Sequence, residues 1–309
     1  MNQYEEICKD MGQRAKVASF ELAQIDQGTL DSALLAIADA VEAQTDEIMA
    51  ANQLDLDKSG DYNVPQTMID RLTLTPSRIS QMAEGVRQVA SIESPVGSVI
   101  ETITRPNGLV IEKRAVPFGV IGIIFEARPN VTIDAGVLCL KTANATILRG
   151  GKEAFHTNQI IVSIMRNTLE TLGITPDAIQ LVEVLDREMV GVLLQQREYI
   201  DVVIPRGGAG LIRRVVNESS IPVIETGSGV CHTFVDEYAN LDMALEIAIN
   251  AKVQRPSVCN SMETLLVHQA VAAEFLPRLD VALQEYGVRI HGDNAVAQYM
   301  GNTIPLTDN

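Results

Sequence analysis

Cys259 lies in the segment Gln-Arg-Pro-Ser-Val-Cys-Asn of residues 254–260 and could act as a nucleophile. Apolar residues of 241–253 recur mostly at helical spacing, and Pro256 disfavours helical geometry at the residue before it. Residues 264–268 form a short strand-like apolar run, so the cysteine lies on a connection, where catalytic residues are common. The alternative is that Cys259 is one more small buried hydrophobic residue.

The elements that would position such a residue alternate along the chain after residue 116. Apolar runs of strand type lie at residues 120–125, 145–148, 179–182, 200–204 and 221–224. Helical patterns lie between them, at residues 133–141, 153–172, 187–196 and 209–217. This alternation is typical of a parallel sheet covered by helices, in which ligands bind at the carboxyl ends of the strands.

Glycine and arginine recur where these strands end. The segments read Glu126-Ala-Arg128-Pro-Asn130, Arg149-Gly-Gly-Lys152, Pro205-Arg-Gly207-Gly208 and Glu225-Thr-Gly227-Ser-Gly229. Glycine lets the backbone approach a ligand closely, and arginine holds phosphate or carboxylate in a fork geometry. The segments predict a site for an anionic, phosphate-bearing ligand. The alternative is that the glycines only terminate strands.

Two common nucleotide fingerprints are absent. Gly119 and Gly122 are wrongly spaced for GxGxxG, and Gly151-Lys152 lacks the glycine and the hydroxyl residue of a P-loop. Any dinucleotide must therefore be held in another way, and ATP-type phosphoryl transfer is disfavoured. The four cysteines show no metal-ligand spacing, so we expect no metal site and no disulfide framework.

Two further side chains could assist Cys259. Glu225 closes a predicted strand and could act as a base, although a carboxylate beside a thiol opposes thiolate formation unless a positive charge such as Arg255 compensates. The alternative is that Glu225 is a solvated charge at a strand end. His232 falls near the same edge, where a structural role is the commoner one for a single histidine.

Composition bounds the class of protein. The 309 residues suggest two domains, and 46% hydrophobic with 21% charged residues is ordinary for a globular chain. The net charge of -16 disfavours nucleic acid and anionic membranes as partners. No apolar run is long enough to span a membrane and the N-terminal sequence lacks a signal peptide pattern, so we expect a cytoplasmic protein.

The first hundred residues predict packing helices. Thr29 and Asp31 are candidate caps of a long amphipathic helix that reaches Met49, and Thr75-Pro76 can begin another. Asn107-Gly108 between two β-rich arms predicts a hairpin over about residues 100–116. Because a two-stranded hairpin is marginal alone, we expect it to lie on another surface or another subunit.

Residues 116–132, 148–154, 204–208 and 254–260 form long motifs, including Val-Pro-Phe-Gly-Val-Ile-Gly-Ile-Ile-Phe-Glu-Ala-Arg-Pro-Asn-Val-Thr. In this order they resemble the gamma-glutamyl phosphate reductases (glutamate-5-semialdehyde dehydrogenases) of the aldehyde dehydrogenase superfamily. The resemblance covers essentially the whole chain. It implies an α/β fold: a Rossmann-like parallel cofactor sheet with helices on both faces, a hairpin arm that forms homo-oligomers, and the start of a second α/β catalytic domain. We place the dinucleotide-binding domain at residues 1–255 and an incomplete catalytic domain at residues 256–309.

The resemblance implies NADPH-dependent reduction of L-glutamyl 5-phosphate to L-glutamate 5-semialdehyde and phosphate, in proline biosynthesis. Cys259 matches the catalytic cysteine that forms a thioester, and Asn130 matches the amide of the oxyanion hole. Glu225 falls where hydrolysing aldehyde dehydrogenases carry a general base, although a reductase must keep water away from its thioester.

Cofactor and substrate residues also follow from the resemblance. Arg149 occupies the region where related enzymes place a lysine near the adenosine ribose, and an arginine there suits the extra phosphate of NADP. Gly207 and Gly208 match the turn beside the pyrophosphate, and we assign Gly227 to the same cofactor site. Arg128 and Arg255 are candidates for holding the anionic groups of the substrate.

Members of this family are substantially longer than 309 residues. The resemblance implies that part of the active-site wall lies beyond Asn309, so we expect these residues alone to be inactive or poorly folded. Three alternatives stay open: another aldehyde or acylating dehydrogenase, a thiol hydrolase that uses Cys259 with His232, and a non-catalytic binding remnant.

Overall fold

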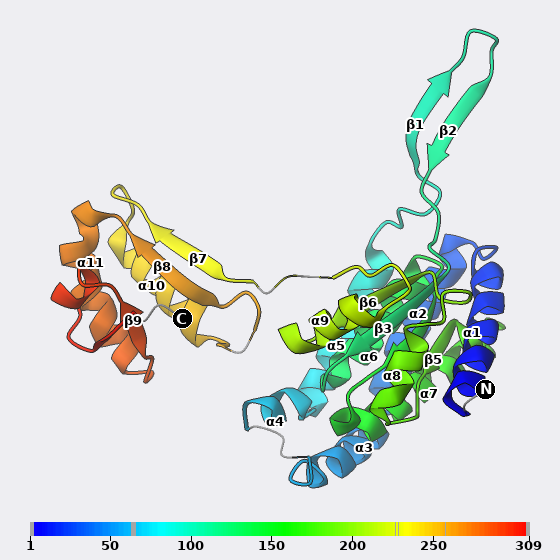
Figure 1. The fold of residues 1–309 in the computed structure, drawn as a ribbon, viewed down its shortest axis with the longest axis horizontal. Coiled ribbons are helices and arrows are strands. Elements are labelled where there is room, and N and C mark those ends of the chain that lie inside the picture. Colours follow the sequence, from blue (N-terminus) through cyan, green and yellow to red (C-terminus); the bar gives the residue numbers. More distant parts are fainter. Residues whose placement is uncertain (1–2, 63–65, 226, 228, 257, 307–309) are drawn as a thin grey trace. The chain divides into compact units, whose positions relative to one another are not determined.

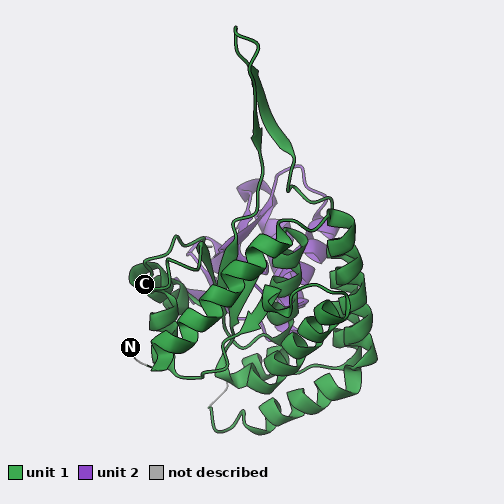
Figure 2. Ribbon diagram, turned by 90° about the vertical axis from the view of Figure 1, so that its right-hand side faces the viewer, with its two compact units in different colours: residues 1–226 green, residues 227–309 purple. Residues whose placement is uncertain are grey.

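The computed structural model describes residues 3–62, 66–225, 227, 229–256 and 258–306. The chain forms two compact units, Met1–Thr226 and Gly227–Asn309 (Figure 2). The boundary predicted from the sequence lies at residue 255 instead. The difference arises because the strand and helix that precede Cys259 pair and pack with elements that follow it.

A parallel sheet forms the centre of the first unit (Figure 1). Its strands are β3 (Val120–Phe125), β4 (Ala145–Arg149), β5 (Ile179–Leu181) and β6 (Val202–Arg206), in the order β5-β4-β3-β6. Chain order therefore reverses direction between β3 and β6, and this switch point is where open α/β sheets bind their ligands. Val203 adds one parallel bridge to Val223 beyond β6. The run predicted as a strand at 221–224 goes no further, since Pro222 has no amide hydrogen to donate.

Helices cover both faces of this sheet, as the sequence predicted. Successive strand residues point to opposite faces. The Gln180 side chain donates to the Met11 carbonyl of α1 (Gln3–Leu22), whereas the side chain of Ile179 lies near Gly136 of α6 (Pro129–Lys141). Further elements of the first unit are α2 (Gln27–Ala43), α3 (Thr45–Asp57), α4 (Gln66–Leu72), α5 (Pro76–Ser91), η1 (Lys152–Ala154), α7 (Phe155–Thr171), η2 (Pro176–Ala178), α8 (Arg187–Leu193) and α9 (Ala209–Glu218).

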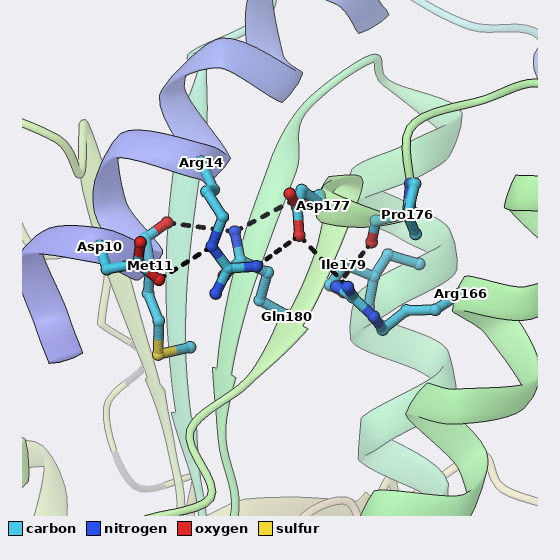
Figure 3. A network of polar contacts seen from close by, with 8 residues as sticks. All are labelled: Asp10, Met11, Arg14, Arg166, Pro176, Asp177, Ile179 and Gln180. Carbon is cyan, nitrogen blue, oxygen red and sulfur yellow. Dashed lines mark hydrogen bonds and ion pairs between the residues drawn. The ribbon is translucent and has the colours of Figure 1, made fainter.

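An ion-pair network fastens α1 to the β5 edge of the sheet (Figure 3). One carboxylate oxygen of Asp177 lies 2.7 Å from Arg14 Nη1 and 3.2 Å from Arg166 Nη2. Arg166 also donates to the carbonyls of Pro176 and Ile179. A helix from each face of the sheet is therefore tied to the same short segment before β5.

The start of α2 differs from the prediction, whereas the start of α5 agrees with it. The cap of α2 is Asp26, whose carboxylate accepts the amide hydrogen of Thr29 at 3.0 Å, and not Thr29 or Asp31. The predicted long helix is also divided, because Gln44 ends α2 and precedes α3. The predicted start at Thr75-Pro76 is confirmed, with Thr75 capping α5 and proline in its first turn.

The predicted hairpin is present as β1 (Val99–Thr104) and β2 (Val110–Arg114), an antiparallel pair that extends away from the sheet (Figure 1). Its turn is longer than an Asn-Gly pair. The amide of Arg105 donates to Leu109 O and the amide of Gly108 to Arg105 O, with φ of 85° at Gly108. Pro106 fixes a negative φ and has no amide hydrogen, which favours this three-residue connection over a two-residue turn.

The second unit has its own core. The parallel pair β7 (Cys231–Val235) and β8 (Met262–Val267) packs with α10 (Leu241–Val253) and α11 (Gln269–Gln284), and Phe275 is fully buried between these elements. The remaining elements are β9 (Ile290–Gly292), η3 (Val296–Gln298) and β10 (Thr303–Pro305). β7 and α10 thus belong with the cysteine connection.

Candidate active site

Glu126 and two glycines meet at the switch point between β3 and β6. The amide of Gly208 donates to Glu126 Oε1 at 2.8 Å, at the N-cap of α9. A Cβ on Gly207 would lie 2.6 Å from Glu126 Cδ, so a larger residue there would displace the Glu126 side chain. The sequence predicted both glycines but gave Glu126 no role. An acidic residue at one strand end and a glycine pair at the next were the available signal.

The connection after β4 is packed closely against the end of β3. A Cβ on Gly151 would lie 3.0 Å from the backbone nitrogen of Ala127, and one on Gly150 would lie 3.1 Å from the Phe125 ring. A side chain at either position would have to displace these neighbours. Their close packing fixes where Lys152 leaves the sheet.

Arg149 is buried and folded back onto the backbone. The side chain is only 7% exposed, and its guanidinium donates to the carbonyls of Gly150 and Leu185. Burial lowers the pKa of Arg149, and the charge of Glu153 opposes that shift. An arginine folded back onto the backbone in this way presents little of its charge to a ligand, so its contact with a cofactor phosphate stays a prediction.

Asn130 stands in the first turn of α6, directly after the end of β3, and is exposed. Its amide donates to the carboxylate of Asp134 at 3.0 Å. Desolvation raises the pKa of Asp134, and the hydrogen bond from Asn130 opposes the rise. Because Nδ2 carries two hydrogens, Asn130 keeps a second one with which it can donate to a developing oxyanion.

The remaining predicted site residues are described by their location and exposure. Arg128 is the N-cap residue of α6 and is partly buried, and Glu225 is exposed near the end of the first unit. In the second unit Gly227 and Arg255 are exposed, and no atom lies within 4 Å of a Cβ built on Gly227. Their roles stay predictions.

Cys259 lies in the connection between α10 and β8, as the sequence predicted, and is exposed. Ser261, which is 3% exposed, holds this connection: its hydroxyl donates to Pro256 O at 3.2 Å and its amide donates to Val258 O. The Cys259 carbonyl oxygen accepts the thiol hydrogen of Cys231 at 3.4 Å. Among the described residues none accepts the Cys259 amide hydrogen, which leaves it available to stabilise an oxyanion.

The other three cysteines are less exposed than Cys259, and His232 is not bonded to it within the described residues. Cys8 and Cys139 are buried, and burial raises their thiol pKa values to about 11 and about 12. A ring nitrogen of His232 lies 2.7 Å from the Val230 carbonyl, and no hydrogen bond within the described part of the chain joins this ring to Cys259. The arrangement gives no support to a Cys-His hydrolase pair.

The described residues contain neither a candidate metal cluster nor a candidate membrane span. No three His, Cys, Asp or Glu side chains cluster in a way that could hold a metal ion. No helix of that part of the chain has the length and apolarity needed to cross a bilayer.

Comparisons with known proteins identify the family to which this α/β fold belongs. The model of the aldehyde dehydrogenase family matches residues 2–303. The chain therefore belongs to the aldehyde dehydrogenase family.

Similar proteins narrow this assignment. The chain is 47% identical over 308 residues to gamma-glutamyl phosphate reductase of Thermobifida fusca, which covers 100% of this chain and 74% of that protein. It is 53% identical over 283 residues to the reductase of Proteus mirabilis, covering 92% and 68%. The solved structure of the Thermotoga maritima reductase has a TM-score of 0.88 at 38% identity, covering 97% and 73%. Within its family, the chain belongs with the gamma-glutamyl phosphate reductases.

Proposed function

We propose that this protein reduces L-glutamyl 5-phosphate to L-glutamate 5-semialdehyde with NADPH and releases phosphate, a step of L-proline biosynthesis. The observation that carries the proposal is the 47% identity to a named reductase along the length of this chain. The exposed thiol of Cys259 supplies the nucleophile that such a reaction needs.

In the proposed reaction the Cys259 thiolate attacks the acyl carbon of the substrate. The C–O bond to phosphate breaks, phosphate leaves with the electron pair, and a thioester with Cys259 remains. The backbone amide hydrogen of Cys259 can donate to the oxygen that becomes negative during this step. Bound NADPH supplies the hydride that reduces the thioester. The C–S bond then breaks, which releases the aldehyde and restores the thiolate.

The residues at the switch point suit a dinucleotide. Gly207 and Gly208 have no side chains at the entrance to α9, where backbone amides and the helix dipole favour an anion. Glu126 is the one unfavourable feature, because its carboxylate already accepts the amide hydrogen of Gly208 and would repel a pyrophosphate. Cofactor binding at this turn therefore requires the Glu126 side chain to move.

The reverse reaction tests the proposal. L-Glutamate 5-semialdehyde, inorganic phosphate and NADP⁺ are mixed with the 309-residue chain, and formation of NADPH is followed by absorbance. Any NADPH that forms should require phosphate, and its formation would overturn the expectation that these residues alone are inactive. Cys259→Ser should then lower the rate by about a thousandfold or more. Cys231→Ser is the matched control and should keep most of the activity, since this thiol donates to the Cys259 carbonyl oxygen and not to its sulfur.

The same assay separates the alternatives. If coenzyme A replaces phosphate in supporting NADPH formation, the protein is an acylating dehydrogenase. If NADPH forms without either acceptor, water hydrolyses the thioester, and Glu225→Gln should then abolish the rate. No NADPH under any condition would contradict the proposal for this chain.

The proposal includes a homo-oligomer formed through the hairpin and a cytoplasmic location. All eleven residues of β1 and β2 are exposed although several are apolar, which supports a partner surface. Free thiols at all four cysteines are the state expected in a reducing compartment. Sedimentation of the double variant Ile100→Asp and Val110→Asp tests the first part: we expect a smaller species than for the original chain, and an unchanged mass would contradict it.

A further inference from the structure

Two of the four cysteines meet in the second unit. The Cys231 thiol, at the start of β7, donates to the Cys259 carbonyl oxygen at 3.4 Å. A Cβ on Gly229, two residues before Cys231, would lie 3.2 Å from the same oxygen. Residues 229–231 are therefore packed against the backbone of Cys259. The contact lies beside the first pairing of β7 with β8, which joins Cys231 to Met262.

This contact brings the two thiols within reach of each other. A carbonyl oxygen lies about 2.4 Å from the Cα of its own residue, so the Cys231 sulfur lies within about 6 Å of Cys259 Cα. Rotation about the Cα–Cβ bond of Cys259 moves its sulfur around that Cα. A disulfide needs Cα atoms about 4.4–6.8 Å apart. Because Cys259 stands on a connection, which adjusts more readily than a strand, we expect a small shift of residues 258–260 to close the remaining distance.

The two thiols differ in their accessibility to solvent. Cys259 is exposed and Cys231 is partly buried, whereas Cys8 and Cys139 are buried in the first unit. A small oxidant in solution therefore reaches Cys259 most readily, and Cys231 is the thiol packed against its backbone. An accessible thiol with a second thiol beside it that can attack its oxidised form is the usual arrangement of a redox-sensitive pair.

We infer that Cys259 and Cys231 form a reversible disulfide when the protein meets a hydroperoxide. The Cys259 thiolate attacks one oxygen of the hydroperoxide, the O–O bond breaks, and Cys259 becomes a sulfenic acid while an alcohol, or water from hydrogen peroxide, leaves. The Cys231 thiolate then attacks the sulfenic sulfur, the S–O bond breaks, and water leaves as the S–S bond forms. The two thiols give up two electrons and two protons, which reduce the hydroperoxide to the alcohol and water.

The disulfide stops the proposed reaction and protects its nucleophile. A sulfur in a disulfide is not a thiolate, so it does not attack the acyl carbon of a substrate. It is also kept from oxidation to sulfinic acid, which thiol reductants do not reverse. A dithiol attacks the disulfide and restores both cysteines. The loss of activity rests on the proposed function, whereas disulfide formation depends only on the two cysteines.

Peptide mapping after oxidation tests the inference without measuring turnover. The dilute 309-residue chain is treated with hydrogen peroxide, remaining thiols are blocked, and trypsin cleaves after Lys252, which separates the two cysteines. We expect a cross-link between the peptides that contain Cys231 and Cys259, in a chain that stays monomeric on non-reducing electrophoresis in denaturant. Alkylation of Cys259 by iodoacetamide should fall at least about tenfold, and dithiothreitol should restore it.

Cys231→Ser removes the second thiol and keeps a side chain of similar size. In this variant Cys259 should pass to sulfinic acid, and dithiothreitol should restore less than about a tenth of its alkylation. Cys139→Ala, which removes a buried thiol of the first unit, is the matched control and should behave as the original chain does. Circular dichroism shows whether each variant is folded before it is oxidised.

The possible results separate this inference from the proposed function. If peroxide gives no cross-link between Cys231 and Cys259 of the same chain, whether Cys259 stays reduced or becomes sulfinic acid, the inference is overturned and the proposed function stands. If the disulfide forms but the reduced chain makes no NADPH in the assay described above, the proposed function fails and the redox-sensitive pair remains.

Discussion

Strand β3 and the hairpin β1–β2 contain similar apolar residues in opposite environments. Every residue of β3 is buried, whereas Ile100 and Val110 of the hairpin are 62% and 56% exposed. β3 has a parallel strand on each side and helices over both faces, whereas among the described strands each hairpin strand pairs with the other alone (Figure 1). An apolar strand sequence therefore specifies a strand, and the neighbouring elements decide whether it becomes core or an exposed surface.

The largest expected effect of this contrast between buried and exposed residues is on the reactivity of two cysteines. Burial raises the thiol pKa of Cys139 to about 12, while Cys259 is exposed on a connection. With iodoacetamide near neutral pH we expect Cys259 to react about a thousandfold faster than Cys139 in the folded chain, because only the accessible thiolate reacts. Mass spectrometry of peptides measures both rates. In denaturant the two should become similar, and similar rates without denaturant would contradict the difference in burial.

Truncation of one isoleucine in each region compares their packing directly. Ile147 of β4 is 0% exposed, so Ile147→Ala should lower the free energy of unfolding by about 3–4 kcal/mol through lost burial and a residual cavity. Ile103 of the hairpin is 38% exposed, and Ile103→Ala should cost about 0.5 kcal/mol or less. Urea unfolding at low protein concentration measures both. Equal losses would show that the hairpin is packed against something in solution.

Removal of an ion pair should also destabilise the sheet region more than the hairpin, but the difference in unfolding free energy should be smaller than for the isoleucines. Asp177 is bound by Arg14 and Arg166 and its side chain is 24% exposed, so Asp177→Ala should lower stability by about 1–2 kcal/mol. The hairpin pair of Arg114 and Glu112 is 53% and 38% exposed, and Glu112→Ala should cost about 0.5 kcal/mol or less. Added salt should reduce the second effect first, because solvent-exposed charges are screened more.

The helix cap at Asp26 should give the smallest effect and a distinct pH dependence. Hydrogen bonds from the Thr29 hydroxyl and amide hold the pKa of Asp26 below its ordinary value of 3.8. Such a group stabilises the fold above its unfolded pKa and loses that contribution as the pH falls through its folded pKa. Asp26→Ala should therefore lower the unfolding temperature near pH 7, and the two chains should converge in strong acid. A difference that stays constant down to about pH 2 would contradict the charged-cap explanation.

The sequence was most informative where local chemistry decides the outcome. Thr75-Pro76 carries both a capping hydroxyl and a first-turn proline, and α5 begins there. The apolar runs after residue 116 predicted four strands of the sheet, since fully buried parallel strands are apolar on both faces. Cys259 was placed correctly between a helix and a strand because Pro256 prevents the helix from continuing.

It was least informative where residues distant in sequence compete for the same group. Asp26 and Asp31 are both reasonable caps, and Asp31 instead accepts a hydrogen bond from Lys141, an interaction that only the folded chain reveals. The sequence predicted Arg149 as a ligand for phosphate but not that its Nη1 and Nη2 donate to the carbonyls of Gly150 and Leu185. The bond between Glu126 and Gly208 and the contact of Cys231 with Cys259 also join separate segments, so no local pattern announced them.

Gly207 has no side chain, and the side chain of Glu126 occupies the space in which one would lie. Positions 126 and 207 should therefore vary together. Any larger residue at position 207 would overlap Glu126, and any shorter residue at 126 would leave the Gly208 amide without its acceptor. A larger residue at position 207 should therefore be tolerated better when residue 126 is made smaller in the same variant. Protein engineers who wish to reshape this turn would need to randomise positions 126 and 207 together.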